Sequence, residues 1–303
     1  MKNKIIPTLI VIVGPTAVGK TSVSIQLAKK YNADVISADS RQFYSEIPIG
    51  TAAPTIEEME GVKHHFVGNL SVNNYYNVSK FETDVINLLE DYFRHKEIMI
   101  MVGGSGLYIN AVCDGIDELP DIDESLRKDL NYLYQEEGLK SLQNKLFTLD
   151  PEYYNKVDIN NPKRLLRALE VCLQTGQTYT SLRKGNKVNR PFNIIKLGLE
   201  LPREQLNERI ERRVYSMLEE KWLDEVKSVY HLKNVNALNT VGYKELFKYL
   251  NAEWDYETAI EKIKVNTRRF AKRQMTWFKR YEDISWFSPN ELNNIIKYID
   301  NRL

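Results

Sequence analysis

Residues 14–21 read Gly14-Pro15-Thr16-Ala17-Val18-Gly19-Lys20-Thr21. This octapeptide matches the phosphate-binding loop pattern G-x-x-x-x-G-K-[ST] at every fixed position. Its glycines allow backbone conformations in which successive N–H groups point at phosphate oxygens. Lys20 brings a positive charge to the distal phosphate, and the Thr21 hydroxyl is a ligand for Mg²⁺. The loop therefore predicts a site for a diphosphate or triphosphate, with Mg²⁺ as the cofactor.

The sequence on both sides of the loop has the context that the motif requires. An apolar run at 8–13 leads in as a strand, and residues 22–30 lead out as a helix whose N-terminus faces the anion. Further apolar runs of strand length lie at 34–38, 98–102 and 194–201. Helical stretches separate the first three runs. This alternation predicts an α/β fold, a P-loop NTPase-like doubly wound parallel sheet.

Composition limits the possible classes of protein. The chain has 303 residues, of which 43% are hydrophobic and 27% charged, as is ordinary for globular domains. A net charge of +1 means that any nucleic-acid surface is a local patch. Cys113 and Cys172 lie in apolar settings, which suits buried thiols in a reducing cytoplasm. Lys2 and Lys4 before an apolar run resemble a secretion signal, but Pro7 favours a first strand. We expect a cytoplasmic protein without a membrane span.

The pattern changes between residues 116 and 193. A helix start at 121–125 is followed by helical periodicity to about Leu149, and again from Pro162 to Thr175. We therefore expect a mostly helical insertion domain at 116–193, within a catalytic core formed by 1–115 and 194–303. After the fourth strand, residues 203–281 are mostly helical, and 285–287 are a candidate last strand.

Polar residues follow the second strand, where Asp39 comes directly after an apolar run. Functional groups gather at the carboxyl ends of parallel strands, so Asp39 is expected beside the phosphate loop. There it could act as a general base or as an outer-sphere partner of Mg²⁺. The alternative is an aspartate that caps a helix or stabilises a turn. The sequence leaves both open.

The third strand ends in glycines, Gly103 and Gly104, followed by Ser105 and Gly106. It lacks the acidic residue that positions Mg²⁺ in many ATP hydrolases. Glycines at a strand end indicate close approach of a ligand or of another backbone, or else a plain tight turn.

Arg209 and Arg213 are four residues apart, so they share one helix face. Two guanidinium groups on one face suit a polyphosphate leaving group. The alternative is a solvated helix on which Glu204, Glu208 and Glu211 neutralise the two arginines.

Two basic clusters point to nucleic acid. Residues 267–281 hold six cations among four aromatic side chains, a combination that binds phosphates and stacks on bases. The alternative is an amphipathic helix that fills the core with Phe270, Met275, Trp277 and Phe278, and both can hold at once. A second, smaller cluster lies at 163–167. The adjacent pair His64 and His65 lacks the neighbours of a metal site, which favours a structural role.

Taken together, these segments resemble the tRNA dimethylallyltransferases, also called tRNA isopentenyltransferases. The matching segments are residues 14–21, 39–44, 49–52, 64–65, 103–108, 161–170, 241–245 and 272–277. The resemblance implies transfer of a five-carbon prenyl group from dimethylallyl diphosphate to N6 of the adenosine just 3′ of the anticodon (adenosine-37). It implies a loop that holds diphosphate rather than ATP, which accounts for the missing strand-end acid. Asp39 would then accept the N6 proton.

The resemblance also assigns the other site residues. Thr16 lines the catalytic pocket, and Lys20, Arg209, Arg213 and Mg²⁺ on Thr21 stabilise the departing diphosphate. The residues expected to meet the tRNA anticodon stem-loop are Asp39, Ser40, Arg41, Gln42, Ser105, Arg127, Lys163, Arg164, Leu165, Leu166, Arg167, Asn239, Thr240, Val241, Gly242, Tyr243, Lys244, Lys272, Arg273, Gln274, Met275, Thr276, Trp277, Phe278 and Lys279.

Some features depart from the family pattern or extend it. Arg41 stands where the family commonly has Met, and Phe43 where it has a small aliphatic residue, which leaves the details of base recognition open. No C-terminal zinc-finger segment of the eukaryotic kind is present, so the resemblance implies a bacterial-type enzyme. A chain that clamps one RNA needs no second copy, so we expect a monomer.

Three other functions fit parts of the sequence. A P-loop small-molecule kinase explains the phosphate loop, Asp39 and the arginine pair, but not the basic helix. An isopentenyltransferase acting on free adenine nucleotide shares the chemistry but needs no basic clusters. A non-catalytic RNA-binding protein with a nucleotide switch has no use for Asp39 beside the loop.

Overall fold

The computed structural model describes residues 6–121, 123–185 and 187–303. Lys2, Lys4 and Ile122, which entered the sequence predictions, lie outside these residues. The chain divides into two compact units, one formed by residues 1–113 with 190–303 and the other by residues 114–189. In the described ranges, no helix has both the length and the apolar composition needed to cross a bilayer.

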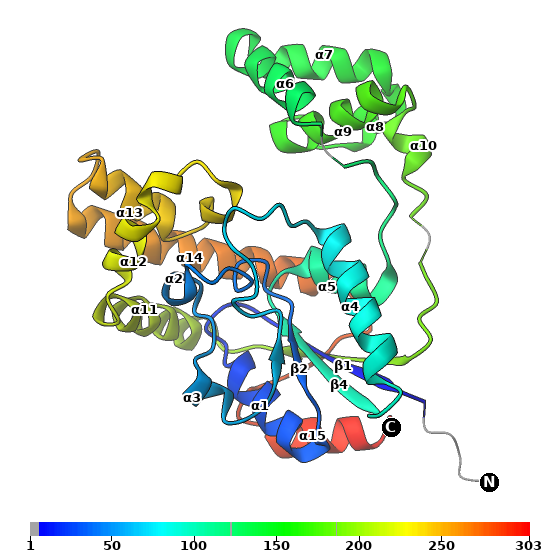
Figure 1. The fold of residues 1–303 in the computed structure, drawn as a ribbon, viewed down its shortest axis with the longest axis vertical. Helices are drawn as coiled ribbons and strands as arrows, with labels where there is room; N and C mark the ends of the chain where they lie inside the picture. The colour runs from blue at the N-terminus through cyan, green and yellow to red at the C-terminus, as the bar shows by residue number, and fades with distance from the viewer. Residues whose placement is uncertain (1–5, 122, 186) are drawn as a thin grey trace. The chain divides into compact units, whose positions relative to one another are not determined.

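The first unit is built on a parallel sheet (Figure 1), as the sequence predicted. The strand order is β3-β2-β4-β1-β5-β6, and every pairing between them is parallel. The bounds are β1 Thr8–Val13, β2 Val35–Ser37, β3 His64–His65, β4 Ile98–Gly103, β5 Asn193–Leu199 and β6 Ser285–Phe287. Apolar runs did not reveal β3, because it has two polar residues and lies at the sheet edge.

Helices cover both faces of this sheet because its strands are apolar on both sides. Leu9 and Val11 of β1 face a cluster with α4 (Val78–Tyr92), α5 (Gly106–Asp114) and the end of α14 (Tyr256–Phe278). Ile10 and Ile12 face the opposite cluster, formed with α1 (Lys20–Tyr31) and α15 (Leu292–Asp300). The sheet is thus doubly wound, and the carboxyl ends of β1, β2 and β4 lie together at one edge.

A group of helices packs around a third core in the same unit. It comprises α2 (Pro48–Thr51), α11 (Arg203–Glu219), α12 (Trp222–Ser228), α13 (Tyr243–Leu250) and the first half of α14, with Trp222, Tyr243 and Ile263 in its core. Since α14 contributes to this core and to the sheet cluster, one helix joins the two. The short elements α3 (Ile56–Met59), η1 (Tyr230–Leu232) and η2 (Asn236–Leu238) complete the unit.

All regular secondary structure in the described residues of the second unit is helical. Its elements are α6 (Glu124–Glu137), α7 (Leu139–Leu149), α8 (Pro151–Lys156), α9 (Pro162–Thr175) and α10 (Tyr179–Leu182). Gly138, at φ +76°, separates α6 from α7, so the long periodic stretch of the sequence forms two helices. Leucines of α6, α7 and α9 form a separate small core.

Candidate active site

The phosphate loop connects β1 to α1 in a conformation that depends on its glycines. Gly14 and Gly19 have φ angles of +151° and +106°. A Cβ atom on Gly14 would lie 2.6 Å from the carbonyl oxygen of Leu199 in β5. Lys20 folds over the loop, and its Nζ donates to the carbonyls of Gly14 (3.0 Å) and Pro15 (2.8 Å). Burial lowers the pKa of Lys20 to about 8, although the nearby Asp39 carboxylate opposes this shift.

Gln274 of α14 fixes the loop to the neighbouring strand end. Its Oε1 accepts a hydrogen bond from the Thr16 backbone N–H (2.9 Å), and its Nε2 donates to the Gly104 carbonyl (3.0 Å). Only 6% of Gln274 is exposed. The sequence assigned this residue to tRNA contact, but the side chain is turned inward and supports the phosphate loop instead.

We expect Gln274→Leu to destabilise the protein by about 1–3 kcal/mol, because the Thr16 N–H and the Gly104 carbonyl lose their buried partner. Affinity for inorganic diphosphate should fall with it. Thermal unfolding and calorimetric titration measure the two effects. Gln205→Leu, at an exposed position of α11, is the matched control. Wild-type values for both properties in Gln274→Leu would contradict this role.

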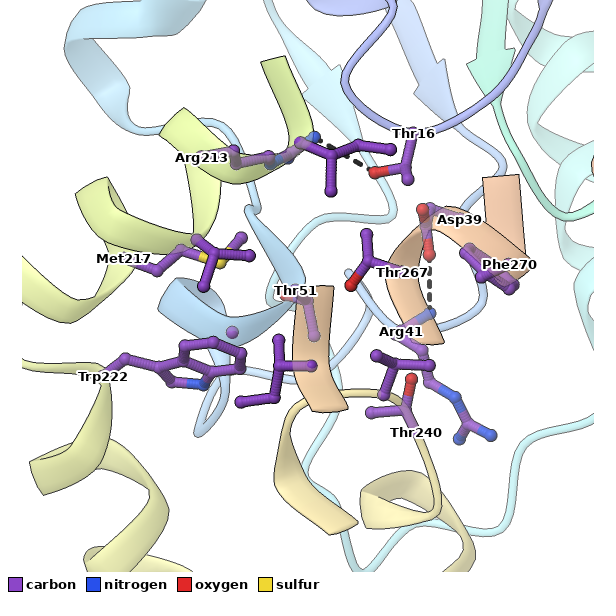
Figure 2. Close-up of a pocket in the computed structure, with 15 residues that line it drawn as sticks. Thr16, Asp39, Arg41, Thr51, Arg213, Met217, Trp222, Thr240, Thr267 and Phe270 are labelled. Carbon is purple, nitrogen blue, oxygen red and sulfur yellow. Dashed lines mark hydrogen bonds between the residues drawn. The ribbon is translucent and has the colours of Figure 1, made fainter. Parts of the chain in front are cut away.

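The two arginines of α11 point at the phosphate loop. Arg209 donates to the carbonyl of Val18 (3.1 Å), and Arg213 donates to the Thr16 hydroxyl (3.3 Å), as Figure 2 shows for Arg213. The alternative in which the helix carboxylates neutralise them is wrong. In the described part of the chain, Glu208 pairs with Arg212 and Glu211 pairs with Arg268 instead. Two cationic groups therefore face the loop.

Asp39 follows β2 and lies in the same pocket as Thr16 and Arg213 (Figure 2). Its Oδ1 accepts a hydrogen bond from the backbone N–H of Arg41 (3.1 Å), so it does stabilise a turn. This turn fixes the carboxylate beside the cavity. The Asp39 charge also raises the pKa of Arg213, against the larger lowering effect of burial. The turn role and a catalytic role are therefore compatible.

The residues after Asp39 make contacts within the protein. The Ser105 hydroxyl accepts from the backbone N–H of Ser40 (2.9 Å). Gln42 donates from Nε2 to the carbonyl of Ala52 (2.9 Å), and Arg41 donates to the carbonyl of Asn236 (2.8 Å). Phe43 is fully buried and stacks on Phe81, so it contacts no base.

The glycines after β4 allow close packing with other parts of the chain. A Cβ on Gly103 would lie 2.3 Å from the carbonyl oxygen of Ala38, and one on Gly106 would lie 2.2 Å from the Trp277 ring. Another backbone thus approaches this strand end, which was one of the two possibilities that the sequence left open.

A cavity of about 110 Å³ lies between the phosphate loop and the helical group. Thr16, Arg213 and Asp39 form its polar side. Arg41, Thr240 and Val241, which the sequence assigned to tRNA contact, also line the cavity. The lining residues that the sequence did not predict are Gly50, Thr51, Ile210, Val214, Met217, Trp222, Ile263, Thr267 and Phe270. Nothing in the sequence distinguishes Trp222 or Met217 from ordinary core residues, because their position depends on how α11 and α12 pack.

Several residues assigned to tRNA have buried side chains. Leu165, Tyr243 and Phe278 are at most 1% exposed and belong to the cores of their units. The prediction of tRNA contact is wrong for these three side chains, because each would have to leave its core. Along α14, Ala271 and Phe278 face inward while Lys272, Arg273 and Thr276 are exposed, so the helix is amphipathic. Phe270 is 37% exposed and does not fill the core.

The other residues assigned to tRNA differ in exposure. Lys163, Arg164, Asn239, Lys244 and Lys279 are exposed, whereas Leu166, Met275 and Trp277 are half-buried and Gly242 is buried.

In the second unit, two arginines of the predicted tRNA surface surround a buried carboxylate. Glu170 of α9 is fully buried. Arg127 donates to it from Nη2 (2.8 Å), and Arg167 Nη1 lies 3.6 Å from its Oε2. Both arginines therefore stabilise the small helical core of this unit, and only their outer edges are available to a ligand.

Comparisons with known proteins agree over nearly the whole chain. The family described as IPP transferase matches residues 42–281. The chain is 50% identical to tRNA dimethylallyltransferase 1 of Bacteroides thetaiotaomicron over 97% of its length and 95% of that protein. It is equally identical to the Bacteroides fragilis enzyme of the same name, over 96% of its length and 97% of that enzyme.

Solved structures give the same result. The full-length tRNA isopentenylpyrophosphate transferase of Bacillus halodurans superposes with a TM-score of 0.72 at 36% identity, covering 97% of this chain and 96% of that one. A eukaryotic dimethylallyltransferase acting on tRNA superposes with a TM-score of 0.75 at 29% identity, covering 95% of this chain and 75% of that one. The phosphate loop, Arg213 and Asp39 around one cavity, together with these matches, show that the chain belongs to the tRNA dimethylallyltransferase family.

Proposed function

We propose that this chain transfers the dimethylallyl group of dimethylallyl diphosphate to N6 of the adenosine just 3′ of the tRNA anticodon. One observation carries the proposal: a phosphate loop, a carboxylate and an apolar wall line a single cavity. A cavity of roughly 150 Å³ holds benzene in an engineered protein core, so about 110 Å³ suits a five-carbon group. The matches to tRNA dimethylallyltransferases disfavour the kinase alternative.

The reaction is a substitution at C1 of the prenyl group. The N6 nitrogen forms a bond to C1 while the bond from C1 to the diphosphate oxygen breaks, and the diphosphate leaves with the bonding electrons. Asp39 accepts the proton that N6 loses, since an exocyclic adenine nitrogen is a weak nucleophile while it keeps both protons. Lys20, Arg209 and Arg213 stabilise the negative charge that grows on the leaving group. The backbone N–H groups of the loop hold the diphosphate in place.

The residues beside the loop fit Mg²⁺. This ion takes few protein ligands and keeps several waters when it binds phosphates. Thr21 lies in the first turn of α1, next to the loop, and is exposed, so its hydroxyl can serve as the one protein ligand. When bound there, Mg²⁺ would neutralise part of the diphosphate charge.

tRNA would bind along the exposed face of α14. Arg269 and Arg273 are exposed on this helix, and Arg273 lies 5.8 Å from the ring of Phe270, which lines the cavity. The basic face therefore begins where the cavity opens to α14. Phosphate contacts here would hold the anticodon loop while the target base leaves its stack and its N6 reaches Asp39 at the edge of the cavity.

The double variant Arg269→Ala/Arg273→Ala should bind tRNA more weakly and with a flatter salt dependence. Each lost phosphate contact reduces the slope of log K against log salt by about 0.7–0.9. Filter binding at several salt concentrations measures this slope. Arg203→Ala/Arg212→Ala, which removes two exposed charges of α11, is the control. A slope equal to that of the wild type would exclude this face of α14 from the interface.

The direct test supplies radiolabelled dimethylallyl diphosphate and Mg²⁺ with either unmodified tRNA or AMP. Label in tRNA that survives phenol extraction supports the proposal. Label in AMP alone indicates the free-nucleotide activity instead. Consumption of ATP in the presence of a small acceptor, with label in neither tRNA nor AMP, would indicate a small-molecule kinase instead.

We also propose that the chain acts as a monomer in the cytoplasm. Both cysteines are buried, which suits a reducing compartment. Equilibrium sedimentation with and without tRNA tests the oligomeric state.

A further inference from the structure

The apolar side of the cavity follows one face of α11 away from the phosphate loop. Arg213, which donates to Thr16, is followed one helical turn later by Met217, and both line the cavity. Four residues of helix rise by about 6 Å. A prenyl chain that starts at the diphosphate would therefore lie along Val214 and Met217. Figure 2 shows Met217 and Trp222 on the side of the cavity away from Asp39 and Phe270.

Trp222 closes that side and has little freedom to move. Its side chain is 2% exposed. A Cβ atom on Gly50 would lie 2.1 Å from its indole nitrogen, and one on Gly242 would lie 2.2 Å from its Cζ2. The ring is thus held between two backbones that carry no side chain at these points. A wall of this kind cannot yield to a longer substrate without moving α2 or the start of α13.

Glu225 fixes one of those backbones. Its carboxylate accepts hydrogen bonds from the backbone N–H groups of Ile49 (2.7 Å) and Gly50 (2.9 Å), and also from the Tyr243 hydroxyl. Tyr243 in turn packs edge-on against Trp222, with ring centroids 6.1 Å apart. The carboxylate therefore holds Gly50 and the two aromatic rings as one rigid group.

We propose that Trp222 and Met217 set the length of the prenyl donor, restricting it to five carbons. This proposal rests on the proposed function. A ten-carbon chain has twice the carbons of the dimethylallyl group, and a cavity of about 110 Å³ closed by Trp222 has no room for the second half. The chemistry of the longer donor would be the same: N6 would bond to C1, diphosphate would leave, and the N6 proton would pass to Asp39. The exclusion of the ten-carbon donor is therefore steric.

The test is a competition between dimethylallyl diphosphate and geranyl diphosphate for transfer to unmodified tRNA, read by mass spectrometry of the nucleosides. Wild type should attach the five-carbon group almost exclusively. Met217→Ala should raise the ratio of ten-carbon to five-carbon kcat/KM by at least about tenfold, since even one methylene in an apolar pocket changes selectivity by 10–200-fold. Trp222→Ala should raise it further.

Two controls separate this role from general loosening. Leu218→Ala changes the neighbouring half-buried residue, which does not line the cavity, and should keep the wild-type ratio. Trp254→Ala removes a tryptophan outside the cavity. Trp222→Ala removes a core residue and risks unfolding. If Trp222→Ala does not fold, the donor selectivity of Met217→Ala tests the proposal by itself.

A wild-type ratio in a folded Met217→Ala variant would overturn the proposal, as would equal gains in Leu218→Ala. Equal use of both donors by the wild type would also overturn it while leaving the proposed function intact. A wild type that transfers neither group would contradict the proposed function itself.

Discussion

Asp39→Asn should lower the rate of prenyl transfer to tRNA by about 10²–10⁴-fold, the usual contribution of a general base. The amide keeps an oxygen that can accept from the Arg41 N–H, so the turn after β2 should persist. It cannot take the N6 proton, however, and the nucleophile stays weak. Single-turnover rates with saturating tRNA and donor measure the chemical step directly.

The affinity of this variant for tRNA should match that of the wild type, because Asp39 offers no cation to a phosphate. Ser40→Ala, next in sequence, is the control for disturbance of the turn. Ser40→Ala should lose far less activity. It removes the hydrogen bond from the Ser105 hydroxyl to the Ser40 hydroxyl, but the backbone N–H of residue 40 still donates to Ser105 and holds the turn. A rate within about tenfold of wild type for Asp39→Asn would make the general-base role wrong.

Arg213→Gln should lower the transfer rate by about 10²–10³-fold, the cost of losing one preorganised group that stabilises developing negative charge. The effect should appear in kcat more than in KM, because the charge on the leaving oxygen grows as the C1–O bond breaks. Burial lowers the pKa of Arg213, and the Asp39 carboxylate opposes this shift.

Arg212→Gln is the matched control, one residue away on α11. Arg212 is exposed and pairs with Glu208 (2.9 Å), so its loss should leave kcat nearly unchanged. Pre-steady-state measurement with dimethylallyl diphosphate separates binding from chemistry. If Arg213→Gln and Arg212→Gln gave equal rates, Arg213 would have no part in stabilising the leaving group.

The amino-acid sequence predicted the parts of the site that depend on short stretches of chain. The phosphate loop needs glycines, a lysine and a hydroxyl at fixed spacing, and the apolar run before it has the length and position of the buried strand that precedes such a loop. Asp39 could be placed beside the loop because β2 and β1 are parallel strands of one sheet. Arg209 and Arg213 could be placed on one face because four residues make one helical turn.

Sequence patterns failed where a residue type suits two environments. Gln274 and Phe278 lie in a stretch rich in cations, which suggested nucleic acid, yet both side chains face inward. The exposed residues between them carry the charge. Which side chains of an amphipathic helix are buried depends on the elements that pack against the helix. The sequence of the helix alone does not specify those elements.

The loop, the parallel sheet around it and the position of Asp39 were thus determined by the sequence, because each depends on local geometry and on the rules of parallel sheets. The cavity wall was decided only by tertiary structure. Gly50, Met217, Trp222 and Phe270 come from four helices, of which only α11 and α12 are neighbours in the chain, and they meet because α2, α11, α12 and α14 bury their apolar faces against one another. Burial is driven by apolar area without regard to sequence distance, so no local pattern marks these residues as neighbours.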